Sequence, residues 1–155
     1  MAETMNTPIG VQQEIFNRTS FGHLCWLHCA QLIQDPSISG LVAHVEMLPS
    51  LLSEAENVLP KEFVLGEMLE TDHLQALVEK LTGKSGTILT GLPLPKKDEV
   101  FILCISNHYV CFLQKGTQDH PDIWRFNPLM HLGFVQSSRA EFREQVPQWA
   151  MSIKL

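Results

Sequence analysis

The chain has 155 residues, of which 45% are hydrophobic and 18% are charged. This size and composition predict a single folded domain over 1–155 and exclude a disordered chain. The formal net charge is −6. It argues against a nucleic-acid-binding protein, because phosphate recognition needs clustered Lys and Arg and the longest basic run here is Lys96-Lys97. A protein partner with a basic surface suits this charge better.

The first residues carry no basic region followed by an apolar stretch, and no apolar run reaches the length of a membrane span. We therefore expect a soluble monomer in the cytoplasm, or alternatively the nucleus, without membrane contact. Residues 1–10 contain Pro and Gly but no apolar face, which predicts a loosely ordered lead-in. The four cysteines are expected to be reduced, because Cys25 and Cys29 lie one helical turn apart and nothing indicates an oxidising compartment.

Apolar residues surround most of the segment from Cys25 to Gln34, which predicts a buried helix with Cys25 at its amino end. Asp35-Pro36 should end this helix. Further helices are predicted over 38–48, 51–58, 62–69 and 72–81. The last is the clearest, since Thr71 can cap it, Leu and Val form one stripe, and Gly83 stands where a left-handed terminator belongs.

After Gly86 the sequence changes to short β-like runs, which predict strands over 87–90, 100–105, 109–114 and 123–127. Ser106-Asn107 suits a tight turn, so neighbouring strands should pair as an antiparallel meander. Ser138 and Glu141 have capping-box spacing and open a short helix that Pro147 should end. Residues 151–155 are expected to close the sheet. The predicted class is α+β, a helical half packed on a small antiparallel sheet.

Cys25 and His108 have the features of a thiol nucleophile and its base. A helix N-terminus and a nearby imidazolium are two standard means of lowering a thiol pKa. Asn127 then follows as the residue that would orient the imidazole, and the order Cys, His, Asn is that of papain-like enzymes. Asn127 precedes Pro128 and suits an ordinary strand-ending turn equally well. The three other cysteines are expected in the core: Cys29, Cys104 and Cys111.

The remaining imidazoles are interpreted as structural. His28 would point along the helix rather than across a cleft. Four others have no acidic or thiol partner at ligand spacing and are expected at the surface or in packing: His44, His73, His120 and His131. A zinc site that uses the cysteines with His23, His28 and His108 is an alternative, although the spacing matches no tight zinc knuckle. We expect no metal and no cofactor.

The segment Leu24-Cys25-Trp26-Leu27-His28-Cys29 resembles the Leu-Cys-x-x-His-Cys signature of the Josephin deubiquitinases. Three later segments are also similar to this family: the run from Phe101 to Cys104, the aromatic residue after His108, and residues 124–127. Gly22 to His28 and Asn107-His108-Tyr109-Val110 resemble the boxes of ubiquitin-specific proteases, but those enzymes carry finger insertions for which this chain has no room. Cys-Trp-Leu is also similar to viral leader proteases. The resemblance implies a papain-like fold and a thiol protease that cleaves peptide or isopeptide bonds at the C-terminus of ubiquitin or a ubiquitin-like protein.

One position departs from this pattern. The family usually has Gln or Asn five residues before the nucleophile to line the oxyanion hole, and here that position is Ser20. Asn17 and His23 are other oxyanion candidates, although neither has the family's spacing. Residues expected to line the substrate cleft are Trp26, Asn107 and Tyr109, with burial in the core an equal alternative for Trp26.

Three functions therefore remain open from the sequence. The first is the thiol hydrolase, in which Cys25 attacks, His108 moves the proton and Asn127 fixes the imidazole. The second is a glutamine deamidase or transglutaminase-like enzyme with the same thiol and imidazole. The third is a catalytically weak or dead binding module in which a helical arm over 51–63 recognises a partner, and Ser20 favours it.

Overall fold

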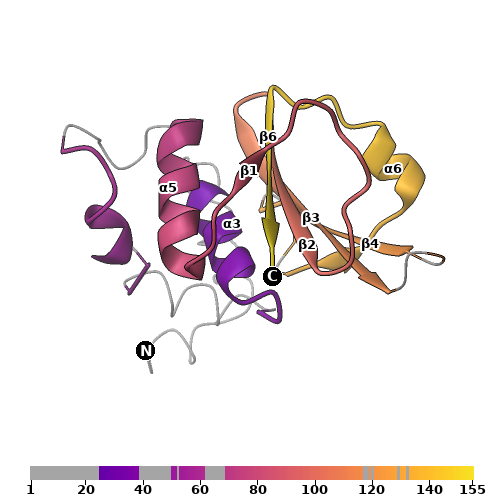
Figure 1. Cartoon of the computed structure of the whole chain (residues 1–155), viewed down its shortest axis with the longest axis horizontal. Helices are drawn as coiled ribbons and strands as arrows, with labels where there is room; N and C mark the ends of the chain where they lie inside the picture. Colours follow the sequence, from indigo (N-terminus) through magenta and orange to yellow (C-terminus); the bar gives the residue numbers. More distant parts are fainter. Residues whose placement is uncertain are drawn as a thin grey trace.

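A six-stranded antiparallel sheet with helices on both faces makes up the described part of the chain (Figure 1). The structure is a computed structural model that describes residues 25–38, 50–51, 53–61, 69–116, 119, 121–128, 130–131 and 133–155. The predicted α+β class is confirmed. The predicted lead-in and most of the helices predicted over 38–48 and 62–69 lie outside the described residues. Residues 50, 51 and 53–56 are helical, and the chain turns at 57–58, so the predicted 51–58 helix ends early.

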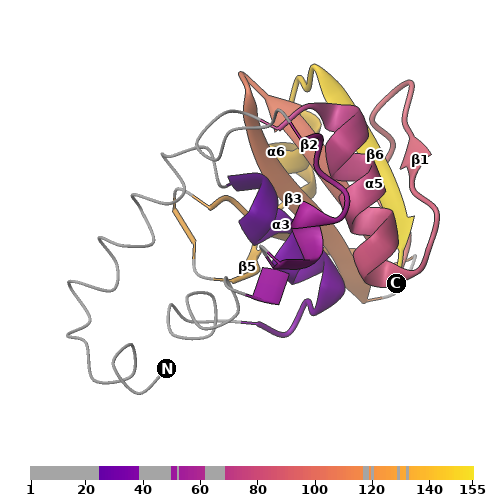
Figure 2. The same cartoon turned by 90° about the vertical axis from the view of Figure 1, so that its left-hand side faces the viewer.

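Helix α3 spans Cys25–Gln34, as the sequence predicts. Every residue from Cys25 to Ile33 is buried. The helix contacts α5 on one side and β3 on the other. Figure 1 shows it between α5 and the sheet, and Figure 2 shows α3 and α5 side by side in front of the strands. Because α3 has protein on all sides, its apolar residues surround the helix instead of forming one stripe.

Helix α5 spans Thr71–Thr82 and buries the predicted stripe of Leu74, Leu77 and Val78. The prediction that Thr71 caps it is wrong, because Thr71 is already the first helical residue. Glu70 is the N-cap and makes no side-chain cap hydrogen bond. Gly83 ends the helix in the left-handed conformation with φ of 69°, and its N–H donates to the Glu79 carbonyl at 2.9 Å, as the terminator prediction requires.

The strands are β1 (Thr87–Ile88), β2 (Glu99–Ile105), β3 (His108–Gly116), β4 (Pro121–Phe126), β5 (Val135–Gln136) and β6 (Trp149–Lys154), in the order β1-β6-β2-β3-β4-β5. The meander β2-β3-β4 is confirmed. The expectation that the first two strands are neighbours is wrong, because β6 lies between them. Both residues of β1 are exposed and suit an edge, whereas the interior of β6 is buried and needs a neighbour on each side. The two-residue strand β5 was not predicted.

The turn between β2 and β3 is the predicted Ser106-Asn107. These residues have φ of 51° and 61°, and Ile105 pairs with His108 directly across the turn. Two positive φ values in a two-residue loop are those of a type I′ turn, whose twist matches that of the flanking strands. This turn sets the register that places His108 as the first residue of β3.

Two apolar clusters cover the two faces of the sheet. One joins α3 and α5 to side chains such as Ile102, Tyr109 and Cys111, and the other contains Val110 and Phe112. Helix α6 (Arg139–Arg143) contributes its buried Phe142 to the second cluster. Burial of both faces explains why β2 reads as a continuous apolar run although it is antiparallel.

The cap of α6 is as predicted, since the Ser138 hydroxyl accepts a hydrogen bond from the Glu141 N–H at 3.0 Å. The predicted end of this helix is wrong, because α6 stops at Arg143, four residues before Pro147. The last strand also starts and ends earlier than the predicted 151–155. No helix among the described residues is both long enough and apolar enough to cross a bilayer.

Candidate active site

The amino end of α3 lies at the start of β3, where β4 does not pair with that strand. The β3–β4 ladder stops at the pair Cys111 and Phe126, so Tyr109 lies beyond it. The Tyr109 carbonyl accepts a hydrogen bond from the Cys29 thiol at 3.4 Å, and the Tyr109 backbone also bonds the Cys25 sulfur. Helix α3 therefore occupies the edge of β3 that β4 leaves free, and it brings Cys25 there.

Cys25 is 1% exposed, and burial raises the pKa of its thiol to about 11. Backbone hydrogen bonds at Tyr109, Trp26 and Cys25 itself act in the opposite direction. Because only a donor stabilises a thiolate, the groups that lower the pKa are backbone N–H groups. The Tyr109 backbone is the largest cause that lowers the thiol pKa, but desolvation outweighs all of them, and the resting thiol keeps its proton.

His108 and Asn127 form the pair that the chain order predicts. His108 Nε2 lies 2.8 Å from Asn127 Oδ1. An amide oxygen only accepts, so Nε2 carries the proton, and Nδ1 of the neutral ring is left with a lone pair. Burial lowers the His108 pKa, and the Asn127 contact opposes this shift. A neutral imidazole with a proton-accepting nitrogen is the form that a general base needs.

Cys25 contacts the backbone of Tyr109, and His108 is the residue before Tyr109 in β3. The Cys25 and His108 side chains are not bonded to each other. Tyr109, whose backbone bonds the sulfur, is the residue after His108, and Asn127 directly follows the last residue of β4. Side chains alternate along β3, so the imidazole belongs to the face opposite Tyr109. No hydrogen bond between Cys25 and His108 occurs among the described residues.

His131 holds the backbone of Asn127, a contact that sequence reasoning missed. The Asn127 N–H donates to His131 Nδ1 at 3.0 Å, and the His131 N–H donates to the Asn127 carbonyl at 2.8 Å. His131 is half-buried, as a packing residue would be, but its contact with Asn127 was not predicted. The spacing of four residues within a turn was the available signal, but nothing in the sequence marked which imidazole would face Asn127.

The other three cysteines are buried, as predicted. Burial raises the pKa of Cys29, and a thiol-to-thiol hydrogen bond with Cys111 adds to this shift. Cys104 also has a pKa raised by burial. All four thiols are free. His28 is buried with Nδ1 3.3 Å from the Gln31 amide oxygen, consistent with a structural residue.

Within the described part of the chain no thiol belongs to a group close enough to share a metal, and His23, which the zinc alternative also uses, lies outside it. Among the described residues, one group has donor atoms close enough to share a metal, and it consists of Glu70, Asp72 and His73 at the start of α5. Both acids are exposed. His73 was expected to have no acidic partner, and this is wrong, since its Nδ1 lies 3.8 Å from the Asp72 carboxylate.

An open hollow of about 370 Å³ lies beside the site. The described residues that line it are Leu69, Glu70, Thr71, Asp72, Cys104, Asn107 and Tyr109. Asn107 and Tyr109, two of the residues expected at the substrate cleft, line this hollow, whereas Trp26 is fully buried in the core. Gln148, which was not predicted, closes one side of this region: its amide oxygen accepts from the Asn107 N–H at 3.2 Å and lies 3.8 Å from the Cys104 thiol.

The oxyanion candidates Ser20, His23 and Asn17 lie outside the described residues. The donors that the structure does describe are the backbone N–H groups at Cys25 and Trp26, which already point at the sulfur. Such groups at a helix N-terminus suit an oxyanion that forms next to the sulfur.

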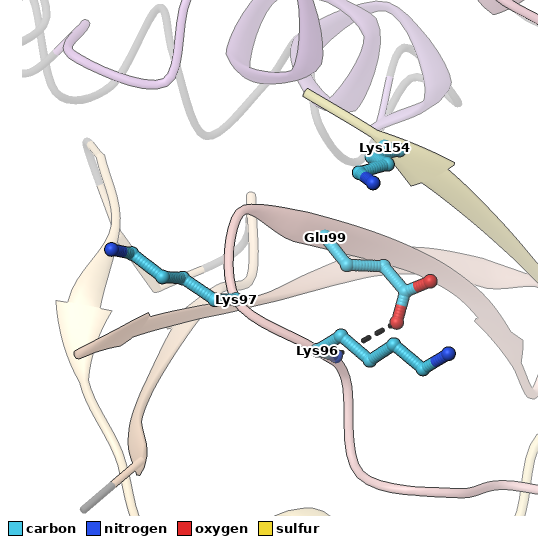
Figure 3. A pocket seen from close by; sticks show the side chains of 4 residues that line it. All are labelled: Lys96, Lys97, Glu99 and Lys154. Atoms are coloured by element: carbon cyan, nitrogen blue, oxygen red, sulfur yellow. Dashed lines mark hydrogen bonds between the residues drawn. The ribbon is translucent and has the colours of Figure 1, made fainter. Parts of the chain in front are cut away.

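A second hollow, of about 320 Å³, is lined by Lys96, Lys97, Glu99 and Lys154 (Figure 3). The amino groups of Lys96 and Lys97 point away from each other (Figure 3). Glu99 accepts a hydrogen bond from the Lys96 N–H at 2.8 Å. The lysines do not converge on one point, so this hollow lacks the geometry of an anion site.

Comparison of the chain with protein-family models, curated proteins and solved structures finds no match.

Alkylation of Cys25 by iodoacetamide should be slow near neutral pH. A thiol with a pKa of about 11 is only about one part in ten thousand thiolate there, and the rate should rise about tenfold per pH unit. Mass mapping of the folded protein over a series of pH values measures how steeply the alkylation rate rises with pH. Limited access to a buried thiol lowers the rate at every pH, so it does not change this slope. The denatured chain is the control and should titrate near an ordinary thiol pKa. A rate that is already at its plateau near neutral pH would show that the thiolate is stabilised after all.

Proposed function

We propose that this protein is a papain-like cysteine hydrolase with Cys25 as nucleophile, His108 as general base and Asn127 as the residue that orients the imidazole. The observation that carries the proposal is the 2.8 Å contact between His108 Nε2 and Asn127 Oδ1. It lies beside the backbone of Tyr109, which bonds the Cys25 sulfur. A histidine held in this tautomer and a thiol at the start of a buried helix are two of the parts that thiol hydrolysis requires, and both belong to the same end of β3.

The reaction would start from a neutral pair. The Cys25 pKa is raised and the His108 pKa is lowered, both by burial, so the proton stays on sulfur until attack. His108 Nδ1 would take that proton as the sulfur bonds to the scissile carbonyl carbon, and the N–H groups at Cys25 and Trp26 would bind the oxyanion. The imidazolium then gives the proton to the leaving amine. A water molecule hydrolyses the thioester in a second step with the same base, which regenerates the thiol.

The proposed substrate is ubiquitin or a ubiquitin-like protein, cleaved at the bond to its C-terminus. The motif resemblance supports this class, and the net charge of −6 favours a partner with a basic surface. Glu70 and Asp72 on the wall of the hollow are consistent with a cationic substrate segment. A location in the cytoplasm or nucleus is proposed as well, because all four thiols are free, the form that reducing compartments maintain.

A catalytically weak or dead binding module is the second candidate. The observation that favours it is the burial of Cys25 with its raised pKa, because a nucleophile normally needs access and thiolate character. In that case the hollow beside Tyr109 would bind a partner without chemistry.

A ubiquitin molecule that carries an electrophile at its C-terminus separates the two candidates. The hydrolase should form a covalent adduct, and peptide mapping should place it on Cys25. His108→Ala should slow adduct formation by at least about a hundredfold, because the thiol would lose its base. Binding without an adduct would favour the module, and an adduct on Cys104 would contradict the assignment of the nucleophile.

A further inference from the structure

The turn that follows β4 contains a second imidazole that touches the candidate triad. The Asn127 N–H donates to His131 Nδ1 at 3.0 Å, and the His131 N–H donates to the Asn127 carbonyl at 2.8 Å. The Met130 N–H also donates to that carbonyl, at 2.9 Å. The backbone of Asn127 is therefore held at both its donor and its acceptor, while its side chain faces His108.

We propose that His131 is a positioning residue that holds Asn127 in place and, through it, orients the His108 imidazole. This inference rests on the proposed hydrolase function. Loss of the His131 ring would remove this acceptor of the Asn127 N–H, so that the turn would hold Asn127 less rigidly, through the Met130 and His131 N–H contacts to its carbonyl. The amide oxygen would then no longer be held at hydrogen-bonding distance from His108, and the proton-accepting nitrogen would lose its direction.

The contact with the Asn127 N–H requires a neutral His131 ring. Nδ1 accepts the Asn127 N–H, so it carries no proton, and a neutral ring must be protonated at Nε2. A protonated imidazole has no acceptor and cannot make this contact. The hydrogen bond from the Asn127 N–H to His131 Nδ1 is thus present only while His131 is neutral.

Three charged or titratable groups face His131 or the residues that it holds. Arg125 on β4 disfavours protonation of the ring, and Glu141 on α6 favours it. Arg125 and Glu141 form an ion pair with each other, and His108 lies beyond Asn127. Burial is the largest cause of the lowered His131 pKa, and Arg125 adds to it. The hydrogen bond from Asn127 to the neutral His131 ring is therefore fully present above the ordinary histidine pKa. It is lost as pH falls through the lowered His131 pKa of the folded protein.

Two substitutions test the acceptor role. His131→Ala removes the ring, whereas in His131→Asn the amide oxygen takes the place of Nδ1 and can accept the same N–H. We expect His131→Ala to lower kcat by about tenfold to a hundredfold at unchanged KM, because misorientation of a catalytic group acts on the chemical step. His131→Asn should recover most of this loss and remove one acidic titration from the kcat profile. Met130→Ala is the matched control, because its side chain is 67% exposed and its backbone contact would remain.

A second measurement does not depend on activity. Nitrogen NMR of the histidine rings reports the tautomer of His108, which should be the Nε2–H form in the wild type and in His131→Asn. In His131→Ala the ring should shift toward a mixture of tautomers. If His108 keeps the same tautomer and titration in His131→Ala, the proposal is overturned, even when the wild type hydrolyses its substrate. If the wild type shows no hydrolysis but His108 responds as expected, the positioning role stands and the proposed function fails. If His131→Ala does not fold, the comparison of wild type with His131→Asn decides.

Discussion

Replacement of Cys25 by Ala should abolish the proposed hydrolysis, with kcat lowered by at least about a thousandfold, because the thioester would lose its proposed nucleophile. Cys25 is 1% exposed, so the loss of its sulfur leaves a small cavity. The free energy of unfolding should fall by only about 1 kcal/mol, as for a minor core truncation. Turnover of a cleavable ubiquitin substrate and a denaturant melt measure the two effects separately.

Cys29→Ala is the matched control, since Cys29 lies one turn further along α3 and is equally buried. It loses the same atom, together with a hydrogen bond to the Tyr109 carbonyl, but it has no place in the proposed chemistry. Similar stability and near-normal turnover are expected for it. Residual turnover in Cys25→Ala that equals that of Cys29→Ala would remove Cys25 from the mechanism.

Replacement of Phe142 by Ala should destabilise the fold by about 3–5 kcal/mol, the range for loss of a fully buried aromatic side chain. Phe142 is fully buried, and its ring lies 5.0 Å from that of Phe112 and 6.0 Å from that of Phe101. It is the buried side chain by which α6 packs on the sheet. A drop of roughly 10 °C in Tm should follow for a chain of this size.

Val146→Ala provides the control for this prediction, because Val146 follows α6 closely and is 84% exposed. Its effect should stay within about 0.5 kcal/mol. If the two substitutions shift the denaturation midpoint equally, α6 is not packed on the sheet as the structure describes.

Local sequence patterns predicted the elements whose signals are local. Helix α3 was predicted at its observed bounds because its apolar residues surround the helix and Asp35-Pro36 follows it. Gly83 and the Ser106-Asn107 turn were also predicted, since left-handed backbone at a helix end and in a two-residue hairpin restricts the residue types that fit. The position of Thr71 was wrong by one residue, since a cap differs from a first helical residue only in backbone geometry.

The sequence by itself determined the α+β class, the strand-turn-strand unit around Ser106-Asn107, and the candidate residues Cys25, His108 and Asn127. Only the tertiary structure decided that β6 lies between β1 and β2, because strand order depends on contacts between residues far apart in the chain. It also decided that His108 meets Asn127 at 2.8 Å, and that His131 holds Asn127 from the turn beyond. The raised pKa of Cys25 was not visible in the sequence, which showed a helix N-terminus that lowers a thiol pKa. The burial that outweighs it arises when α3 is enclosed by α5 and β3.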